Sequence, residues 1–131
     1  MPTPLVIERL NHVARPTTRL DESRRFWVEV MGAREISRPG FSFRGAWLYL
    51  AGIQIHLIED TAVPGPSDAI NTRARHMAFA VPDVDAMERV LETHGVAYER
   101  KLIPGRGIHQ IFFHDPDGHM IEIGKYGVID Q

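Results

Sequence analysis

The sequence contains no cysteine among its 131 residues. This absence excludes disulfide bonds, thiolate nucleophiles and sulfur-ligated metals, so any bound metal must be held by His, Asp or Glu. Basic residues are not in excess either, because 15 Lys and Arg stand against 17 Asp and Glu and no run of five basic residues occurs. We therefore expect no nucleic-acid partner and no anionic membrane surface as a partner.

A long apolar stretch that could form a signal peptide or a membrane span is also lacking. The expected protein is cytoplasmic, and its apolar content of 44% is sufficient for the core of one domain.

An internal repeat becomes visible when residues 10–57 are aligned with residues 74–123. The offset is 64 residues at the start of the alignment and 66 at its end, as expected for two copies of one unit with small insertions. The matched pairs include His12 with His76, Ala14 with Ala78, Asp21 with Asp85, Arg25 with Arg89, Gly52 with Gly118 and His56 with Glu122.

The order of the expected elements is the same in both halves: a strand, a helix and three strands. Thr18 and Asp21 are residues typical of a helix start, and Gly32 of a helix end, so they bound the first expected helix. Asp83 and Gly95 mark the start and the end of the second. The alternation of apolar residues predicts strands at residues 10–14, 34–38, 46–50, 53–59, 76–81, 97–103, 109–113 and 119–124. We interpret residues 1–131 as a single domain with a first module at about 5–59, a Pro- and Gly-rich linker at about 60–74 and a second module at about 75–125.

Four residues are candidates for metal ligands because of their place in the repeat and their parity, that is, the side of the strand on which they lie. They are His12, His56, His76 and Glu122. In each of their strands, alternate apolar residues would face the helix, and the four would lie on the other side among small or polar neighbours. Three imidazoles and a carboxylate suit zinc, manganese, nickel, cobalt or ferrous iron, and the residue types do not choose among these metals. The alternative is that the histidines are scattered, but their repeat-equivalent positions favour a metal site.

The segments LNHVA, GAWLYLAGIQIHLIE, RHMAFAV and FFHDPDGHMIEIG resemble the vicinal oxygen chelate superfamily, which includes the glyoxalase, bleomycin-resistance, fosfomycin-resistance and extradiol dioxygenase proteins. The resemblance is greatest to glyoxalase I-like proteins. It implies an α+β fold in which paired βαβββ modules form an incomplete barrel around a metal site. It also implies that His12, His56, His76 and Glu122 are the ligands of a divalent metal ion, and that the chain forms a homodimer with shared active sites.

The resemblance further implies a metal-dependent glyoxalase I-like lyase or isomerase that acts on a small oxygen-chelating substrate through an enediolate or oxyanion intermediate. Glutathione or another thiol is a candidate co-substrate. Glu122 or His56 would move the proton, since imidazole titrates near neutral pH. The chain departs from bacterial and human glyoxalase I at His56, where those enzymes have a carboxylate, so a shuttle between two carboxylates is not expected unchanged.

Three alternatives remain open. One is a thiol transferase of the fosfomycin-resistance type, although Ala14 stands where those enzymes carry Thr. The second is an extradiol dioxygenase, which needs two His, one carboxylate and open positions on iron. The third is a metal-free drug-binding protein, which the intact ligand set disfavours.

Five further residues are candidates for binding the substrate: Gln54, Gln110, Phe112, Trp47 and Arg106. Gln54 shares a face with His56, and Gln110 and Phe112 have the parity that would line the same hollow as Glu122. For the amides a structural role at a sheet edge is an equal alternative, while Trp47 in the core and Arg106 in solvent are the simpler interpretations.

Overall fold

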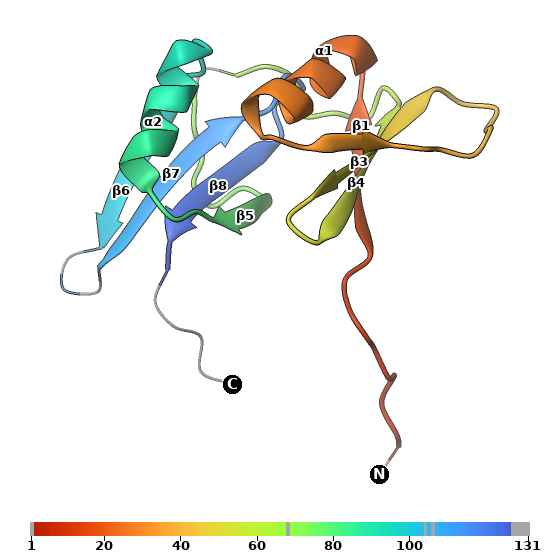
Figure 1. Ribbon diagram of the computed structural model, residues 1–131, viewed down its shortest axis with the longest axis horizontal. Coiled ribbons are helices and arrows are strands. Elements are labelled where there is room, and N and C mark those ends of the chain that lie inside the picture. Colours follow the sequence, from red (N-terminus) through yellow and green to blue (C-terminus); the bar gives the residue numbers. More distant parts are fainter. Residues whose placement is uncertain (1, 68, 104, 106, 127–131) are drawn as a thin grey trace.

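The computed structural model describes residues 2–67, 69–103, 105 and 107–126. It contains two successive units, each with a strand, a helix and three strands, which confirms the predicted α+β fold of paired βαβββ modules (Figure 1). The elements of the first unit are β1 (His12–Thr17), α1 (Leu20–Arg25), the π-helical turn η1 (Phe26–Val30), β2 (Arg34–Ile36), β3 (Gly45–Leu50) and β4 (Ile53–Glu59). The elements of the second unit are β5 (His76–Ala80), α2 (Val84–Thr93), β6 (Tyr98–Ile103), β7 (Ile108–His114) and β8 (Met120–Lys125).

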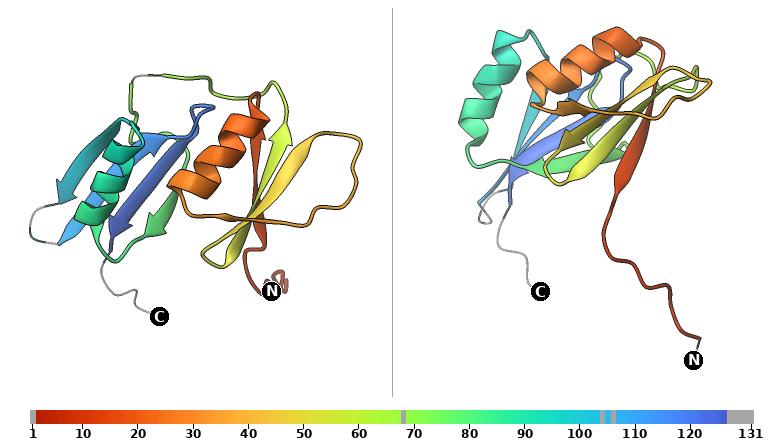
Figure 2. Two further views of the ribbon diagram at one scale, coloured as in Figure 1. Left: turned by 45° about the horizontal axis from the view of Figure 1, so that its top comes forward. Right: turned by 45° about the vertical axis from the view of Figure 1, so that its right-hand side comes forward.

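Each unit forms a four-stranded sheet of the same topology. The strand orders are β1-β4-β3-β2 and β5-β8-β7-β6, with the first pair of each sheet parallel and the other pairs antiparallel. The sheets do not close on themselves, and both helices lie on the same side of them (Figure 2). The two sheets thus leave their other faces uncovered by helix.

The registers of the two sheets coincide at the positions of His56 and Glu122. His56 is paired with Ala14 on one side and Trp47 on the other. Glu122 is paired in the same way with Ala78 and Phe112. Residues that match in the alignment of the two sequence halves therefore occupy equivalent positions in the two sheets.

The core lies between the sheets and the helices. Leu48, Ile55, Ile111 and Ile121 alternate with residues of the uncovered face and are at most 1% exposed. Burial of such side chains is the main favourable term in folding, at roughly 25 cal/mol per Å² of apolar surface. The pattern of apolar residues alone therefore fixes which face of each strand turns toward the helices.

The first helix joins the two units. The ring of Trp27 contacts Phe79 edge-on with centroids 6.4 Å apart, and Phe26 contacts Phe113 at 6.4 Å. Both contacts run from the first unit to the second. Because Trp27 has no exposed surface and Phe26 is 8% exposed, this pair anchors the junction of the units.

The same helix differs in form from the regular helix that the sequence predicts. It continues from Arg25 as the π-helical turn η1, in which the amide of Met31 donates to the carbonyl of Phe26 at 3.2 Å. The wider turn brings the neighbouring rings of Phe26 and Trp27 closer to one side of the helix. Within this turn both adjacent rings pack against rings of the second unit, and the helix still ends at Gly32, whose φ is 81°.

The starts of the helices show one prediction confirmed and one wrong. Asp83 caps α2, because its side chain accepts from the amide of Ala86 at 3.0 Å. Thr18 does not cap α1; its hydroxyl donates to Asp117 of the second unit instead. A distant carboxylate is a partner that spacing within the helix could not reveal.

The first strand is shifted relative to the predicted residues 10–14. β1 begins at His12 and continues to Thr17, because its parallel partner β4 extends to Glu59. Residues 2–11 lie outside regular structure and extend away from the sheets (Figure 1), and Leu10 is 60% exposed.

Candidate functional site

The sheet faces turned away from the helices carry the candidate ligands. We call them the open face of the first sheet, with His12, Trp47, Gln54 and His56, and the open face of the second sheet, with His76, Gln110, Phe112 and Glu122. Parity places these side chains opposite the core, as the sequence predicted.

Three rings are stacked on the open face of the first sheet. The centroids of His12 and His56 are 4.1 Å apart with an interplanar angle of 12°, and Trp47 stacks on the other side of His56 at 4.1 Å and 6°. Trp47, for which a place in the core was the simpler interpretation, therefore contacts a candidate ligand directly.

Hydrogen bonds to side-chain amides set the tautomers of these two histidines. His56 Nε2 lies 2.8 Å from Gln54 Oε1, and His12 Nδ1 lies 2.9 Å from Asn11 Oδ1. Because an amide oxygen only accepts, the hydrogen resides on the imidazole nitrogen in both contacts. In the neutral form of each ring, the unshared electron pair is then on Nδ1 of His56 and on Nε2 of His12.

The environment favours a neutral ring at His56. Its pKa is lowered first by burial, then by its proximity to His12 and to the positive charge of Arg38. Metal ligation requires neutral imidazole, so this shift fits a ligand or a proton acceptor.

On the second open face, His76 and Glu122 meet. His76 Nε2 lies 3.1 Å from Glu122 Oε1, and His76 Nδ1 lies 2.7 Å from the carbonyl oxygen of Ala74. The carbonyl only accepts, so Nδ1 carries a hydrogen, and Nε2 then faces the carboxylate with an electron pair unless it is protonated. Two electron-rich atoms this close require a proton or a cation near them.

The carboxylate of Glu122 is buried and fixed by two further donors. It is 5% exposed, and its Oε2 accepts hydrogen bonds from Gln110 Nε2 at 3.0 Å and from the Tyr126 hydroxyl. Burial, together with the hydrogen bond to Glu122, raises the pKa of Tyr126 well above its ordinary value, so the phenol remains a donor. Oε1 is the oxygen left for His76 or a cation, and an imidazole and a carboxylate form a donor set that fits a divalent metal.

The four candidate ligands form two pairs within one chain. His12 lies with His56, and His76 lies with Glu122. Within the residues that the structure describes, no three His, Asp or Glu side chains gather closely enough to hold one ion. The convergence of all four on one ion, which we predicted, is not formed inside a single chain.

The predicted substrate-binding residues have varied surroundings. Gln54 and Gln110 are bonded to His56 and Glu122, and Phe112 contacts His76 edge-on at 6.0 Å. Arg106 lies outside the described residues. The two amides therefore hold candidate ligands in position, and binding of a substrate by any of these residues stays a prediction.

Sequence reasoning missed Asn11, Tyr126 and Arg38, which contact or influence the candidate ligands. Tyr126 has the parity of Glu122 along the continuation of β8, and this signal could have found it. A Cβ at Gly124 would lie 2.9 Å from the Tyr126 ring, so the glycine leaves the space that the phenol occupies.

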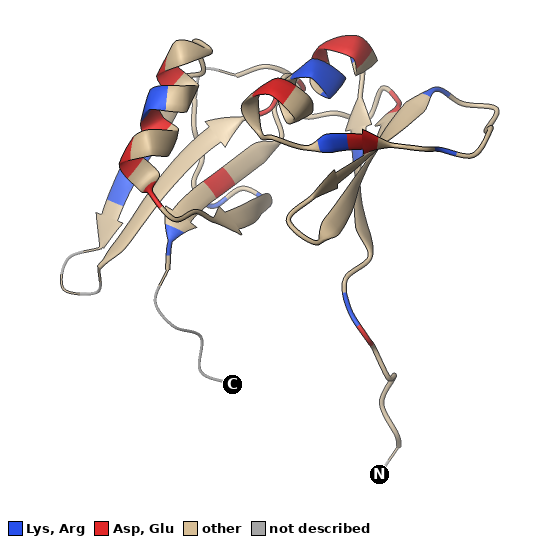
Figure 3. Ribbon diagram, in the orientation of Figure 1, with Lys and Arg blue, Asp and Glu red and all other residues tan. Residues whose placement is uncertain are grey.

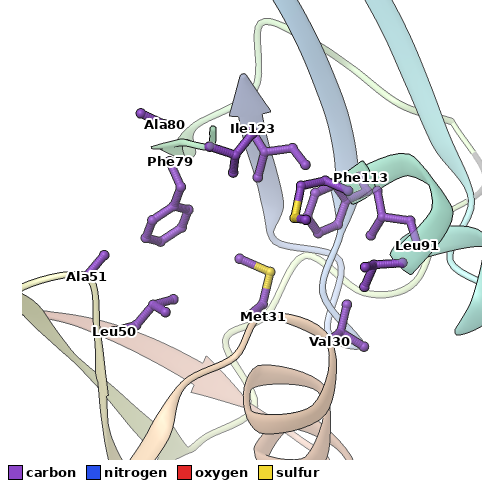
Figure 4. Close-up of a pocket in the computed structure, with 12 residues that line it drawn as sticks. Val30, Met31, Leu50, Ala51, Phe79, Ala80, Leu91, Phe113 and Ile123 are labelled. Carbon is purple, nitrogen blue, oxygen red and sulfur yellow. The ribbon is translucent and has the colours of Figure 1, made fainter. Parts of the chain in front are cut away.

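An apolar cavity of about 150 Å³ lies elsewhere, on the helix side between the two units. Figure 4 shows its lining by Val30, Met31, Phe79, Leu91 and Phe113, among others. None of the candidate ligands borders this cavity, so it is distinct from the open faces.

No helix in the described part of the chain has the length and apolar character to span a bilayer.

Comparison with known proteins defines the class of this fold and site. The family model of the Glyoxalase/Bleomycin resistance protein/Dioxygenase superfamily matches residues 9–123. The chain therefore belongs to this superfamily, as the sequence motifs predicted.

Individual relatives cover most of the chain. The protein named Glyoxylase I 4 from Arabidopsis thaliana is 42% identical over 126 residues, which cover 92% of this chain and 72% of the relative. YaeR from Escherichia coli strain K12 is 30% identical, with 91% and 97% covered. Among solved structures, a mutant of the fosfomycin resistance protein FosX from Listeria monocytogenes was determined with Mn(II) and 1S,2S-dihydroxypropylphosphonic acid. It matches this chain with a TM-score of 0.80 at 19% identity, and the match covers 94% of this chain and 95% of the FosX chain. This last likeness is one of fold. The relatives indicate a glyoxalase-like enzyme of the superfamily.

Proposed function

We propose that the protein is a metal-dependent glyoxalase I-like lyase or isomerase whose active site is shared between two copies of the chain. The observation that carries the proposal is the 3.1 Å approach of His76 Nε2 to Glu122 Oε1, in which the other polar atoms of both side chains already have partners. The name of the Arabidopsis relative supports glyoxalase I-like chemistry, and the Mn(II) in the FosX structure supports a divalent metal in this fold.

A second copy is proposed as the source of the missing ligands. The pair His12 and His56 would complete the pair His76 and Glu122 of the partner subunit, giving three imidazoles and one carboxylate. His12 and His76 are exposed and lie on β1 and β5, the edge strands of the two sheets. Within the described part of the chain, each of these strands pairs with a single other strand. Such open edges are places where another chain can approach.

When bound, a divalent cation would supply Lewis acidity toward two neighbouring oxygens of a small substrate. Glu122 would accept or return the proton at Oε1, while Gln110 and Tyr126 keep Oε2 occupied and hold the carboxylate in one orientation. His56 offers one electron pair at Nδ1, so it serves either as a ligand or as the second proton acceptor.

Metal analysis tests the cation. We expect about one divalent ion per chain in the purified protein, loss of most of it in His76→Ala and Glu122→Gln, and retention in His94→Ala, a control at the C-terminus of α2. Equally negligible metal in the unaltered protein and in His76→Ala would remove the proposal.

Mixing two inactive variants tests whether the active site is shared between two chains. With the hemithioacetal of methylglyoxal and glutathione as substrate, His12→Ala and Glu122→Ala should each lose at least roughly 100-fold in kcat/KM. After the two variants exchange subunits, a mixed dimer has one intact site, so roughly a quarter of the activity should return. No recovery after verified exchange would show that each site belongs to one chain.

A further inference from the structure

The loop between β2 and β3 carries a cation enclosed by aromatic rings. Arg38 Cζ lies 4.9 Å from the centroid of Phe41 and 5.0 Å from that of Phe43, and these two rings are stacked on each other at 5.2 Å. Arg38 Nη2 also donates to the carbonyl of Phe43 at 2.7 Å. These contacts hold the guanidinium in one place, since cations are attracted to the faces of aromatic rings.

Arg38 has no carboxylate partner among the described residues, whereas another arginine of the same loop does. Arg44 Nη1 lies 2.9 Å from Glu59 Oε2. Arg38 makes no such ion pair within the described part of the chain, and its Nε is enclosed without an acceptor. The loop contains basic residues and no acidic ones (Figure 3). A half-buried positive charge without a counter-charge is an attractive position for an anion.

The guanidinium lies on the open face of the first sheet. Position 45 has the parity of Trp47 and His56, and a Cβ at Gly45 would lie 3.2 Å from Arg38 Nη2. The absence of a side chain at Gly45 therefore leaves room for Arg38 over the sheet. Arg38 is thus on the same face as the candidate metal ligands.

A row of rings connects Arg38 to those ligands. The centroid of Phe41 lies 6.1 Å from Trp47, and Trp47 and His12 flank His56 at 4.1 Å each. Phe41 and Phe43 are 45% and 44% exposed and stack on each other, and adjoining exposed apolar side chains are typical of surfaces that bind a ligand. The row of rings therefore leads from a cation to the candidate metal site.

We propose that Arg38 binds the carboxylate of an anionic substrate, whose apolar portion lies on Phe41 and Phe43 while its reacting oxygens reach His12 and His56. The inference rests on the proposed function, because it names the class of substrate for that same site. A carboxylate satisfies the guanidinium by charge-assisted hydrogen bonds, which a neutral group of the same shape does not provide.

Benzoate and its neutral counterpart benzamide are suitable probes. The protein is treated with a chelator, so that metal binding does not contribute to the signal. Trp47 belongs to the row of rings, and the other tryptophan, Trp27, is fully buried, so quenching of tryptophan fluorescence reports occupation of the open face. We expect benzoate to bind at least roughly tenfold more tightly than benzamide. Arg38→Met should remove this preference, Arg38→Lys should retain part of it, and Arg44→Met, the matched control in the same loop, should retain all of it.

A titration of the unaltered protein, in which a variant serves only to assign one signal, guards against variants that fold poorly. In NMR spectra of the unaltered protein, the Nε–Hε signal of Arg38, assigned by its loss in Arg38→Lys, should shift with benzoate and not with benzamide. Equal affinities for the two probes, equal benzoate affinity in Arg38→Met, or an unshifted signal would each overturn the inference. Metal content and hemithioacetal turnover are measured separately, so a failure of the proposed function is distinguishable from a failure of the Arg38 site.

Discussion

Asp117 and Thr18 are 99 residues apart in the chain, yet Asp117 Oδ1 accepts hydrogen bonds from the backbone N–H of Thr18 at 2.9 Å and from its hydroxyl at 3.0 Å. Asp117 is 1% exposed and lies in the turn between β7 and β8. In the same region His119 Nε2 donates to the carbonyl of Pro16 at 2.8 Å. The turn of the second unit therefore holds the junction of β1 and α1 in the first.

Removal of this carboxylate should weaken the union of the two units. We expect Asp117→Ala to lower the free energy of unfolding by about 2–4 kcal/mol, because two donors lose a buried acceptor. Asp117→Asn should cost less, since its amide oxygen can still accept. Urea unfolding measures the change, with the exposed Asp60→Ala as the control, and an equal loss in that control would contradict the assignment.

Asp115 should make the protein less stable as the pH rises. Burial is the main cause that raises the pKa of this carboxyl from 3.8 to about 6, against the opposing influence of His119. The folded state then holds more protons than the unfolded state between these values, so stability is greatest below pH 4 for this group and is lost as the pH passes about 6. The loss is on the order of 3 kcal/mol at 1.4 kcal/mol per unit.

Asp115→Asn removes the titration while its oxygen can still accept from the amides of Asp117 and His119. The free energy of unfolding of this variant, relative to the unaltered protein, should therefore increase between pH 4 and pH 7. Urea unfolding at several pH values tests this, with Asp60→Asn as the control. A difference that is constant with pH would refute the assignment.

The hairpin between β3 and β4 contains a turn that its sequence does not favour. Ala51 has a φ of 52° and Gly52 a φ of 86°, and Leu50 pairs with Ile53, so the two-residue loop has the positive φ values that a type I′ turn requires. Because asparagine tolerates this conformation better than alanine, Ala51→Asn should raise the free energy of unfolding by roughly 0.5–1 kcal/mol. Gly52→Ala, the opposite change, should lower the free energy of unfolding. Thermal unfolding of both variants checks that one is stabilised and the other destabilised.

Tyr126 should influence the metal without being a ligand. If the proposed site holds a cation, loss of the hydroxyl that donates to Glu122 should weaken its affinity by roughly 10–100-fold in Tyr126→Phe. Competition with a chelating dye measures this, and Tyr49→Phe on the first sheet is the matched control. Unchanged affinity in Tyr126→Phe would show that the phenol has no part in orienting the carboxylate.

Much of the fold could be predicted because it depends on local rules. Alternation of apolar residues predicted the strands and their faces, and the cap at Asp83 and the end at Gly95 were readable from residue type. The π-helical turn was not, because it depends on the packing of Phe26 and Trp27 against rings of the second unit. The bond between Asp117 and Thr18 was missed for the same reason.

The sequence by itself determined the two repeated units, the parity of the candidate ligands and the family to which the chain belongs, since each follows from short-range pattern. Tertiary structure alone decided that the ligands form the pairs His12 with His56 and His76 with Glu122, and that Arg38 lies among exposed rings on the open face. These relationships join residues of different strands and loops. Their distances are set by sheet register and by packing between elements, which no local pattern specifies.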